Sequence, residues 1–206
     1  MALVGACIAQ VLRLTRDGWS AGAAVGSVLA VAVGTAAFAY LILVIAGARN
    51  RRLLNLLSAG DPGTPVFAVY YSRELHTALE GLELVHESSR AFNKHGAVQV
   101  GQDGLRFWVT RKGGPVMPTR VARLPWERAL FADGAAIEID GHSHPGLSIS
   151  IWSGAPSETV ELEFGVASRR FGAFFPSRRG RAECLRAVKS RISEMDHLAE
   201  RVDRQD

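Results

Sequence analysis

The chain's most extended apolar stretch lies near its start. Residues 18–48 contain no charged side chain, and the stretch ends abruptly in Arg49, Arg51 and Arg52. At a rise of about 1.5 Å per residue, a helix of this length can cross a hydrocarbon layer of about 30 Å. A core helix of a soluble protein seldom runs so far without a charge, because one of its faces meets water. The pattern therefore predicts a transmembrane helix over residues 21–48.

A secretory signal is the main alternative for this stretch. Arg13 and Arg16 would form its positive region, and Ala46-Gly47-Ala48 has the small-x-small form of a cleavage site. The hydrophobic region of such signals is typically about 7–15 residues long, and this stretch is roughly twice that. A long apolar run followed at once by three arginines favours a stop-transfer anchor, with residues 1–20 as a short N-terminal segment.

The flanking charges predict an orientation. Arg13 and Arg16 precede the stretch, with Asp17 beside them, and three arginines follow it. The positive-inside rule therefore places the C-terminal side in the cytoplasm, by a margin of one residue. Trp19 is the expected interfacial anchor on the opposite side of a plasma (inner) membrane. A cleaved or inverted chain would instead work outside the cytoplasm.

Small residues recur at every fourth position in the first half of the stretch. They are Gly22, Gly26, Ala30 and Gly34. Such a strip lets two helices approach closely, and it predicts a homo-oligomer held through the membrane helix. Chance matches in an Ala/Gly-rich composition are the alternative.

Residues 49–65 are interpreted as a basic juxtamembrane linker. Its first part has the pattern of an amphipathic helix, with four leucines along the membrane surface and the arginines near anionic headgroups. These leucines are Leu53, Leu54, Leu56 and Leu57. The stretch "SAGDPGTP" has turn chemistry and marks the start of a soluble domain over residues 66–206.

The periodicity of residues 66–206 predicts an α+β domain. Residues 66–95 begin with a strand at 66–71, and apolar positions from Leu75 to Phe92 have helical spacing after Ser72. Residues 96–176 change to short strands, with turn signals at 101–104 and 132–135. The strands are expected at 97–100, 105–110, 124–132, 136–140, 147–152, 159–165 and 170–175.

A C-terminal amphipathic helix is expected within residues 177–202. Its apolar stripe predicts a helix over 181–201, which starts near Ser177 or Gly180 and covers the strands. The stripe consists of Cys184, Leu185, Val188, Ile192, Met195 and Ala199.

The stretch from Ala97 to Arg201 resembles the pleckstrin-homology (PH) superfold, and "LPWERALFADGAAIEID" is similar to two strands of bacterial PH-like domains on membrane-anchored proteins. The turn Pro125-Trp126-Glu127 belongs to this similarity. The resemblance implies a PH-like seven-stranded antiparallel barrel or sandwich capped by a C-terminal helix. The helix 181–201 lacks the tryptophan of eukaryotic PH domains, and the loop 101–104 carries an acid and no base. The resemblance therefore does not extend to a lipid-headgroup site.

The net charge of +4 divides into +3 for residues 1–63 and +1 for residues 64–206. The basic balance is thus mainly a property of the membrane flank. A nucleic-acid-binding domain is itself strongly basic, so this class of protein is not expected. Cys7 and Cys184 lie on opposite sides of the predicted span, which excludes a disulfide between them and fits a reduced cytoplasmic domain.

Two clusters are candidates for chemistry. His142 and His144, at i and i+2, share one side of an extended segment and are weak metal-ligand candidates with Asp140, but a polar loop is the preferred interpretation and no metal is expected. An arginine patch around the last strand and the helix start would receive anionic lipid or an acidic partner, since a helix N-terminus favours anions. A solvated basic face is its alternative. The patch comprises Arg169, Arg170, Arg178, Arg179, Arg181 and Arg186.

The remaining reactive or aromatic side chains are assigned to structure. Trp108, Trp126 and Trp152 fall in expected strands, and at least two of them are expected in the core. Cys184 lies on the apolar stripe and is expected to be an inert thiol. No nucleophile elbow, phosphate loop, paired zinc cysteines or dinucleotide fingerprint is present, so neither an enzyme nor a cofactor is expected.

Three functions follow from these features. The first is a non-enzymatic single-pass membrane protein that presents a cytoplasmic PH-like interaction domain to a membrane-associated protein. The second is an extracytoplasmic protein, cleaved or inverted, of unknown activity, for which a metal dependence through His142 and His144 is one option. The third is an auxiliary subunit of a transporter or envelope complex, which differs from the first mainly in its partner.

Overall fold

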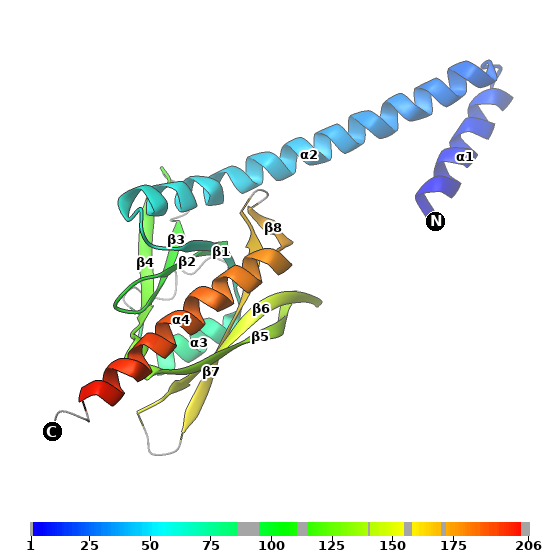
Figure 1. Cartoon of the computed structure of the whole chain (residues 1–206). Helices are drawn as coiled ribbons and strands as arrows, with labels where there is room; N and C mark the ends of the chain where they lie inside the picture. Colours follow the sequence, from blue (N-terminus) through cyan, green and yellow to red (C-terminus); the bar gives the residue numbers. More distant parts are fainter. Residues whose placement is uncertain are drawn as a thin grey trace. The chain divides into compact units, whose positions relative to one another are not determined.

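The computed structural model describes residues 2–85, 95–110, 115–139, 141–154, 158–169 and 172–202 (Figure 1). The chain divides into two compact units, Met1–Ile45 and Ala46–Asp206, and each is described by itself.

The first unit contains helix α1 (Ala2–Arg16) and the first part of helix α2 (Ala21–Gly60). Gly18 has φ +89° and follows α1, which is the conformation that commonly ends a helix. The Ser20 side chain then accepts a hydrogen bond from Ala23 N–H at 3.3 Å and starts α2. α2 is long and apolar enough to span a membrane, and none of its most apolar part is buried.

α2 begins at Ala21, where the pattern predicts. It is 40 residues long and ends at Gly60, instead of ending at Ala48. The second part of α2 belongs to the second unit and replaces the expected linker helix on the membrane surface. Three of its leucines are buried against the sheet, and Leu56 remains 40% exposed. The buried three are Leu53, Leu54 and Leu57.

The second unit is built on one antiparallel sheet. Its strands follow the order β4-β3-β2-β1-β7-β6-β5, and β8 pairs with β7 off this path. Most neighbours are consecutive hairpins, but β1 lies between β2 and β7 and so joins the beginning of the unit to its end. The strands are β1 (Val66–Tyr71), β2 (His95–Val100), β3 (Leu105–Thr110), β4 (Pro118–Leu124), β5 (Ala129–Ile139), β6 (His142–Trp152), β7 (Thr159–Ser168) and β8 (Gly172–Pro176).

The main hydrophobic core lies on one face of this sheet. Helix α3 (Arg73–Gly81) and helix α4 (Arg178–Val202) bring apolar side chains to it, and α4 lies across the strands (Figure 1). The rings of Phe107 and Phe164 meet edge to face at 5.9 Å between centroids near its middle. The helical contributors include Leu75 and Leu79 of α3 and Cys184, Val188 and Ile192 of α4.

A second hydrophobic cluster lies on the other face of β1. The leucines of α2 pack there against Val66, Ala68 and Tyr70 of β1, because alternate side chains of a strand point to opposite faces. Ala97 and Ala167 extend the cluster onto β2 and β7. The segment expected as a linker is therefore part of the folded unit.

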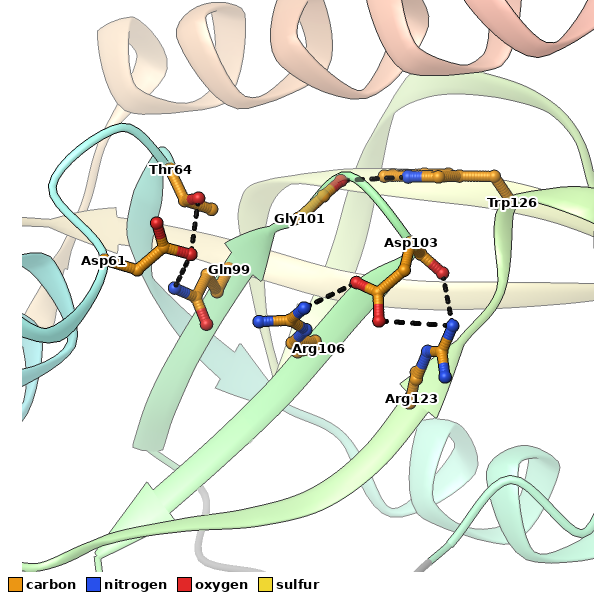
Figure 2. A network of polar contacts seen from close by, with 8 residues as sticks. All are labelled: Asp61, Thr64, Gln99, Gly101, Asp103, Arg106, Arg123 and Trp126. Carbon is orange, nitrogen blue, oxygen red and sulfur yellow. Dashed lines mark hydrogen bonds and ion pairs between the residues drawn. The ribbon is translucent and has the colours of Figure 1, made fainter.

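The turn after α2 is fastened to the end of β2. Asp61 accepts hydrogen bonds from Thr64 at 2.6 Å and from the amide of Gln99 at 3.4 Å (Figure 2). Val100 N–H donates to the Pro65 carbonyl at 3.0 Å. These contacts set where β1 begins, and the Gln99 side chain is only 2% exposed.

The β2–β3 hairpin forms at 101–104 as expected. Its Asp103 carboxylate contacts Arg106 at 2.6 Å and Arg123 at 3.2 Å, and the buried indole N–H of Trp126 donates to the Gly101 carbonyl at 3.0 Å (Figure 2). These contacts join β3, β4 and the turn that follows β4 to one hairpin. Burial raises the pKa of Asp103, but the guanidinium groups of Arg106 and Arg123 lower it further, so this pKa lies below its ordinary value.

The prediction of one strand over 124–132 was wrong. β4 ends at Leu124, and a 3-10 turn at Trp126–Arg128 separates it from β5. Pro125 has no N–H to continue a ladder, and burial of the Trp126 indole holds the chain in this turn. Residues 118–124 form a strand that the pattern did not reveal, because its first positions are polar and only partly buried.

The turn expected at 132–135 was also wrong. β5 runs without interruption to Ile139, with Asp133 opposite Ser148 and Gly134 opposite Leu147. Pairing with the long strand β6 overrides the local turn preference of Asp-Gly. The helix expected after Ser72 is capped as predicted, with Leu75 N–H donating to the serine at 3.0 Å. It ends at Gly81, and its expected continuation over 82–85 was wrong, because Glu83 has φ +56° and Val85 bridges to Ala122 of β4. The rest of its expected length, 86–92, lies outside the described residues.

The buried leucines of α2 give a prediction about stability. In the full chain in detergent, Leu53→Ala is expected to lower the free energy of unfolding of the second unit by about 2–5 kcal/mol, as large-to-small changes in cores do. Leu56→Ala is the matched control, and its cost is expected to stay below about 1 kcal/mol because its side chain is exposed. Urea unfolding followed by tryptophan fluorescence measures both. Equal effects of the two variants would contradict the packing of α2 on the sheet.

Candidate functional site

β5 is an open edge strand of the sheet in the described residues. β5 pairs with β6 alone and ends the strand order. The opposite edge, β4, is partly covered, because Val85 bridges to Ala122 and Arg123 N–H donates to the Leu84 carbonyl at 3.2 Å. An open edge presents unpaired backbone N–H and C=O groups to another chain. β5 is therefore the place where the fold offers backbone pairing.

A groove of about 380 Å³ separates the start of β5 from α4. We call it the edge groove, and its lining residues are Leu130, Phe131, Ala132, Asp133, Lys189, Ile192 and Ser193. The β5–β6 register shifts between Ala129 and Phe131, which marks a β-bulge. Leu130 and Phe131 are 47% and 58% exposed, although both are large and apolar. The bulge thus leaves two adjacent apolar side chains at an open strand edge.

The electrostatics of the edge groove centre on Asp133. Its carboxylate accepts a hydrogen bond from Gly134 N–H at 2.8 Å and lies 3.6 Å from the Lys189 ammonium. These contacts lower the pKa of Asp133, the backbone hydrogen bond most of all. The guanidinium of Arg181 lies beside Gly134, at the far end of the same stretch of β5. The α4 wall therefore carries two cations against one carboxylate on the strand.

The six candidate arginines do not gather in one patch. Arg169 and Arg179 line a second hollow, between β1, β7 and the start of α4. Arg181 lies by Gly134 of β5, on the other side of α4. Arg178 and Arg186 are exposed, as a solvated basic face would be, and Arg170 lies outside the described residues.

The two histidines lie at the start of β6 in different surroundings. His142 is exposed, whereas His144 is half-buried with its ring centroid 5.4 Å from that of Tyr70. The described residues contain no group of three or more side chains suited to hold a metal, and Asp140 lies outside them. Burial raises the pKa of Tyr70 to about 12, so this cluster carries a neutral phenol at ordinary pH.

One of the three tryptophans is fully buried, whereas at least two were expected in the core. Trp126 is buried at 2% exposure, Trp108 packs half-buried beside the second cluster, and Trp152 is 47% exposed at the end of β6. Cys184 lies fully buried in the main core as expected, and desolvation raises the pKa of its thiol far above the ordinary value.

Most of the residues predicted for the membrane segment and its flanks are solvent-exposed. Trp19 is 50% exposed, Arg49 and Arg52 are exposed, and Arg51 is half-buried. The small-residue strip faces open space, and a Cβ added to any of its three glycines would have no neighbour within 4 Å. The strip consists of Gly22, Gly26, Ala30 and Gly34.

The sequence patterns did not identify the residues that form the edge groove. The adjacent Leu130 and Phe131 were the available signal, since strict alternation would have buried one of them. Among known proteins, no family model matches this chain, and no curated protein matches it.

The burial of Cys184 gives a prediction about thiol reactivity. In a Cys7→Ser chain, modification of Cys184 by a disulfide reagent is expected to be at least about 100-fold slower in the folded protein than in urea, because the thiol is desolvated and protonated. Absorbance of the released reagent thiolate measures both rates. Rapid modification of the folded chain would show an accessible, activated cysteine and contradict the inert assignment.

Proposed function

We propose that the chain is a non-enzymatic, single-pass membrane protein that presents a protein-binding domain, with the edge groove as the binding surface. This proposal rests mainly on one observation: β5 is an open sheet edge beside exposed apolar side chains and beside a groove that α4 lines on its other side. An extended segment of a partner would add a strand to β5, and its alternate side chains would enter the groove.

The surroundings of the groove favour a partner segment with apolar and acidic residues. Leu130 and Phe131 supply apolar surface that an occupant would remove from water, at about 25 cal/mol per Å². Lys189 and Arg181 on the α4 side exceed the single carboxylate of Asp133. Main-chain pairing provides affinity in this mode, and the apolar pocket and the cations provide selectivity.

The anchor and its orientation are part of the same proposal. The apolar part of α2 would cross the plasma (inner) membrane, and Arg49, Arg51 and Arg52 would hold its C-terminal flank in the cytoplasm. The long apolar helix and the arginines that follow it support this topology. Confinement to the membrane raises the domain's concentration near other membrane proteins, so a modest affinity suffices.

PH-like identity of the second unit is also proposed. The antiparallel strand path and the C-terminal helix across one face support it. The resemblance was drawn for Ala97 to Arg201, whereas the sheet also includes β1, which lies between β2 and β7. A transporter or envelope complex is one kind of partner that the groove would serve. Anionic lipid is a secondary partner in this proposal, and it would contact Arg49, Arg51 and Arg52 beside the membrane helix.

Site-specific photo-crosslinking in membranes tests the edge groove. A photoreactive phenylalanine analogue replaces Phe131 at the groove or Met117 beside β4, two side chains of similar exposure at 58% and 63%. A discrete adduct is expected from position 131, absent at 117, and lost when Lys189→Glu reverses a groove charge.

Three outcomes would contradict this proposal. They are identical adducts from both positions, an adduct from position 117 alone, and an adduct from 131 that Lys189→Glu leaves unchanged. Thermal unfolding of each variant in detergent serves as the folding control. Both replaced side chains are solvent-exposed, so their folded yield is expected to match that of the parent chain.

A further inference from the structure

Strand β5 is long for an open edge. It has eleven residues, and none of them is lysine or proline. Edge strands of natural proteins are often short or carry lysine or proline, because unpaired backbone groups invite pairing with another chain. After the bulge between Ala129 and Phe131, residues 131–139 pair with β6 in an unbroken register. This regular part of β5 offers its other edge to a further strand.

Gly134 shows which backbone groups of β5 face the open side. Its N–H donates to the carboxylate of its neighbour Asp133 at 2.8 Å, so this donor lies on the side away from β6. Backbone groups of successive strand residues point alternately to the two edges of the strand. Those of Ala136 and Glu138 therefore face the open side as well.

The regular part of β5 can pair with itself. In an antiparallel pair of two β5 strands, all residues of 131–139 find a partner when a twofold axis passes through their midpoint, Ala135. Gly134 then lies opposite Ala136 of the second copy, and both turn their backbone groups towards each other, as an antiparallel ladder requires. The centre of the strand is Gly134-Ala135-Ala136, so no large side chain obstructs the approach.

The same register brings opposite charges together. Glu138 is exposed, and in the described part of the chain it forms no ion pair. The register places it opposite Ala132 of the second copy, on the face of the sheet where Ala132 lines the edge groove. Lys189 lies in that groove and Arg181 lies beside Gly134, so the glutamate would meet an excess of cations.

We propose that the occupant of the edge groove is strand β5 of a second copy of this chain. This inference rests on the proposed use of the edge groove for strand addition, and it names the partner. The two sheets would join into one, with Glu138 of each copy in the groove of the other. Such pairing uses both β5 edges at once, and the β4 edges are partly covered, so the assembly closes as a dimer. The small-residue centre and the exchanged glutamates favour a second copy over an unrelated segment.

Disulfide crosslinking in isolated membranes tests the position of the axis. In a Cys7→Ser chain, Ala135→Cys is expected to give a linked dimer under mild oxidation. The two copies of an axis residue have Cα atoms about 4.5 Å apart, within the range of about 4.4–6.8 Å that a disulfide spans. Ala136→Cys is the matched control on the same strand, and it is expected to link at least about tenfold more slowly because its two copies lie further apart. Non-reducing gels measure both rates.

Charge reversal tests the exchanged glutamate. In the Ala135→Cys chain, Glu138→Lys is expected to slow the linking about tenfold, because it opposes Lys189 of the second copy. Adding Lys189→Glu is expected to restore the rate to within about threefold, since the opposite charges are exchanged. Glu74→Lys, at an exposed glutamate of α3 outside the groove, is the control and is expected to change nothing. Thermal unfolding in detergent checks that each variant is folded.

Three results would overturn this inference: equal linking at 135 and 136, no linking at 135, or linking that Glu138→Lys leaves unchanged. The photo-crosslink from position 131 separates its failure from that of the proposed function. The inference predicts an adduct with twice the mass of the chain. An adduct with another protein, without linking at 135, would overturn the inference and leave the edge groove as a binding surface. Absence of both the adduct and the link would overturn both proposals.

Discussion

Strand β1 is the element on which the second unit depends, because it is covered on both faces and paired on both edges. Its odd-numbered residues Val69 and Tyr71 enter the main core, and its even-numbered residues Val66, Ala68 and Tyr70 enter the cluster beneath α2. The Tyr71 hydroxyl donates to the Ala97 carbonyl at 2.7 Å and accepts from Trp108 N–H at 3.2 Å. This six-residue strand thus contributes to both hydrophobic clusters and contacts α2, β2, β3 and β7.

The same placement explains where the molecule is open. With β1 in the middle of the strand order, the sheet has edges at β4 and β5, and residues 84–85 cover only the β4 edge. β7 pairs with β1 over three residues, and its last residues pair with β8. The edge groove follows from this pairing, and it offers backbone groups beside Lys189 and Arg181. Such surfaces suit recognition of extended chains more than they suit chemistry on a substrate.

Sequence patterns predicted the elements that have one buried face and one solvent-facing face. Residues 105–110 form a strand at the expected bounds, since their burial alternates in strict order. Ser72 caps a helix as expected, because this signal is local. The Asp133-Gly134 turn failed, because pairing with β6 is a long-range effect that a local signal does not contain.

The sites were harder to predict than the elements. The leucines of α2 fit a membrane surface and a sheet surface equally well, and only the fold places Leu53 against β1. The arginines after Ser168 are close in sequence, yet the turn of α4 directs Arg179 and Arg181 to different sides of the helix. The exposure of Phe131 depends on a bulge, which periodicity does not reveal.

Protease protection of the full chain tests the central claim of a membrane-anchored cytoplasmic domain most directly. Spheroplasts that express the chain with a C-terminal tag are treated with protease, and the mass of the tagged product is measured. The account predicts a protected tag on a product of full length, because the proposed orientation places the arginines after Ala48 in the cytoplasm. A digested tag, or a product shorter by about 48 residues as signal cleavage would give, would contradict it.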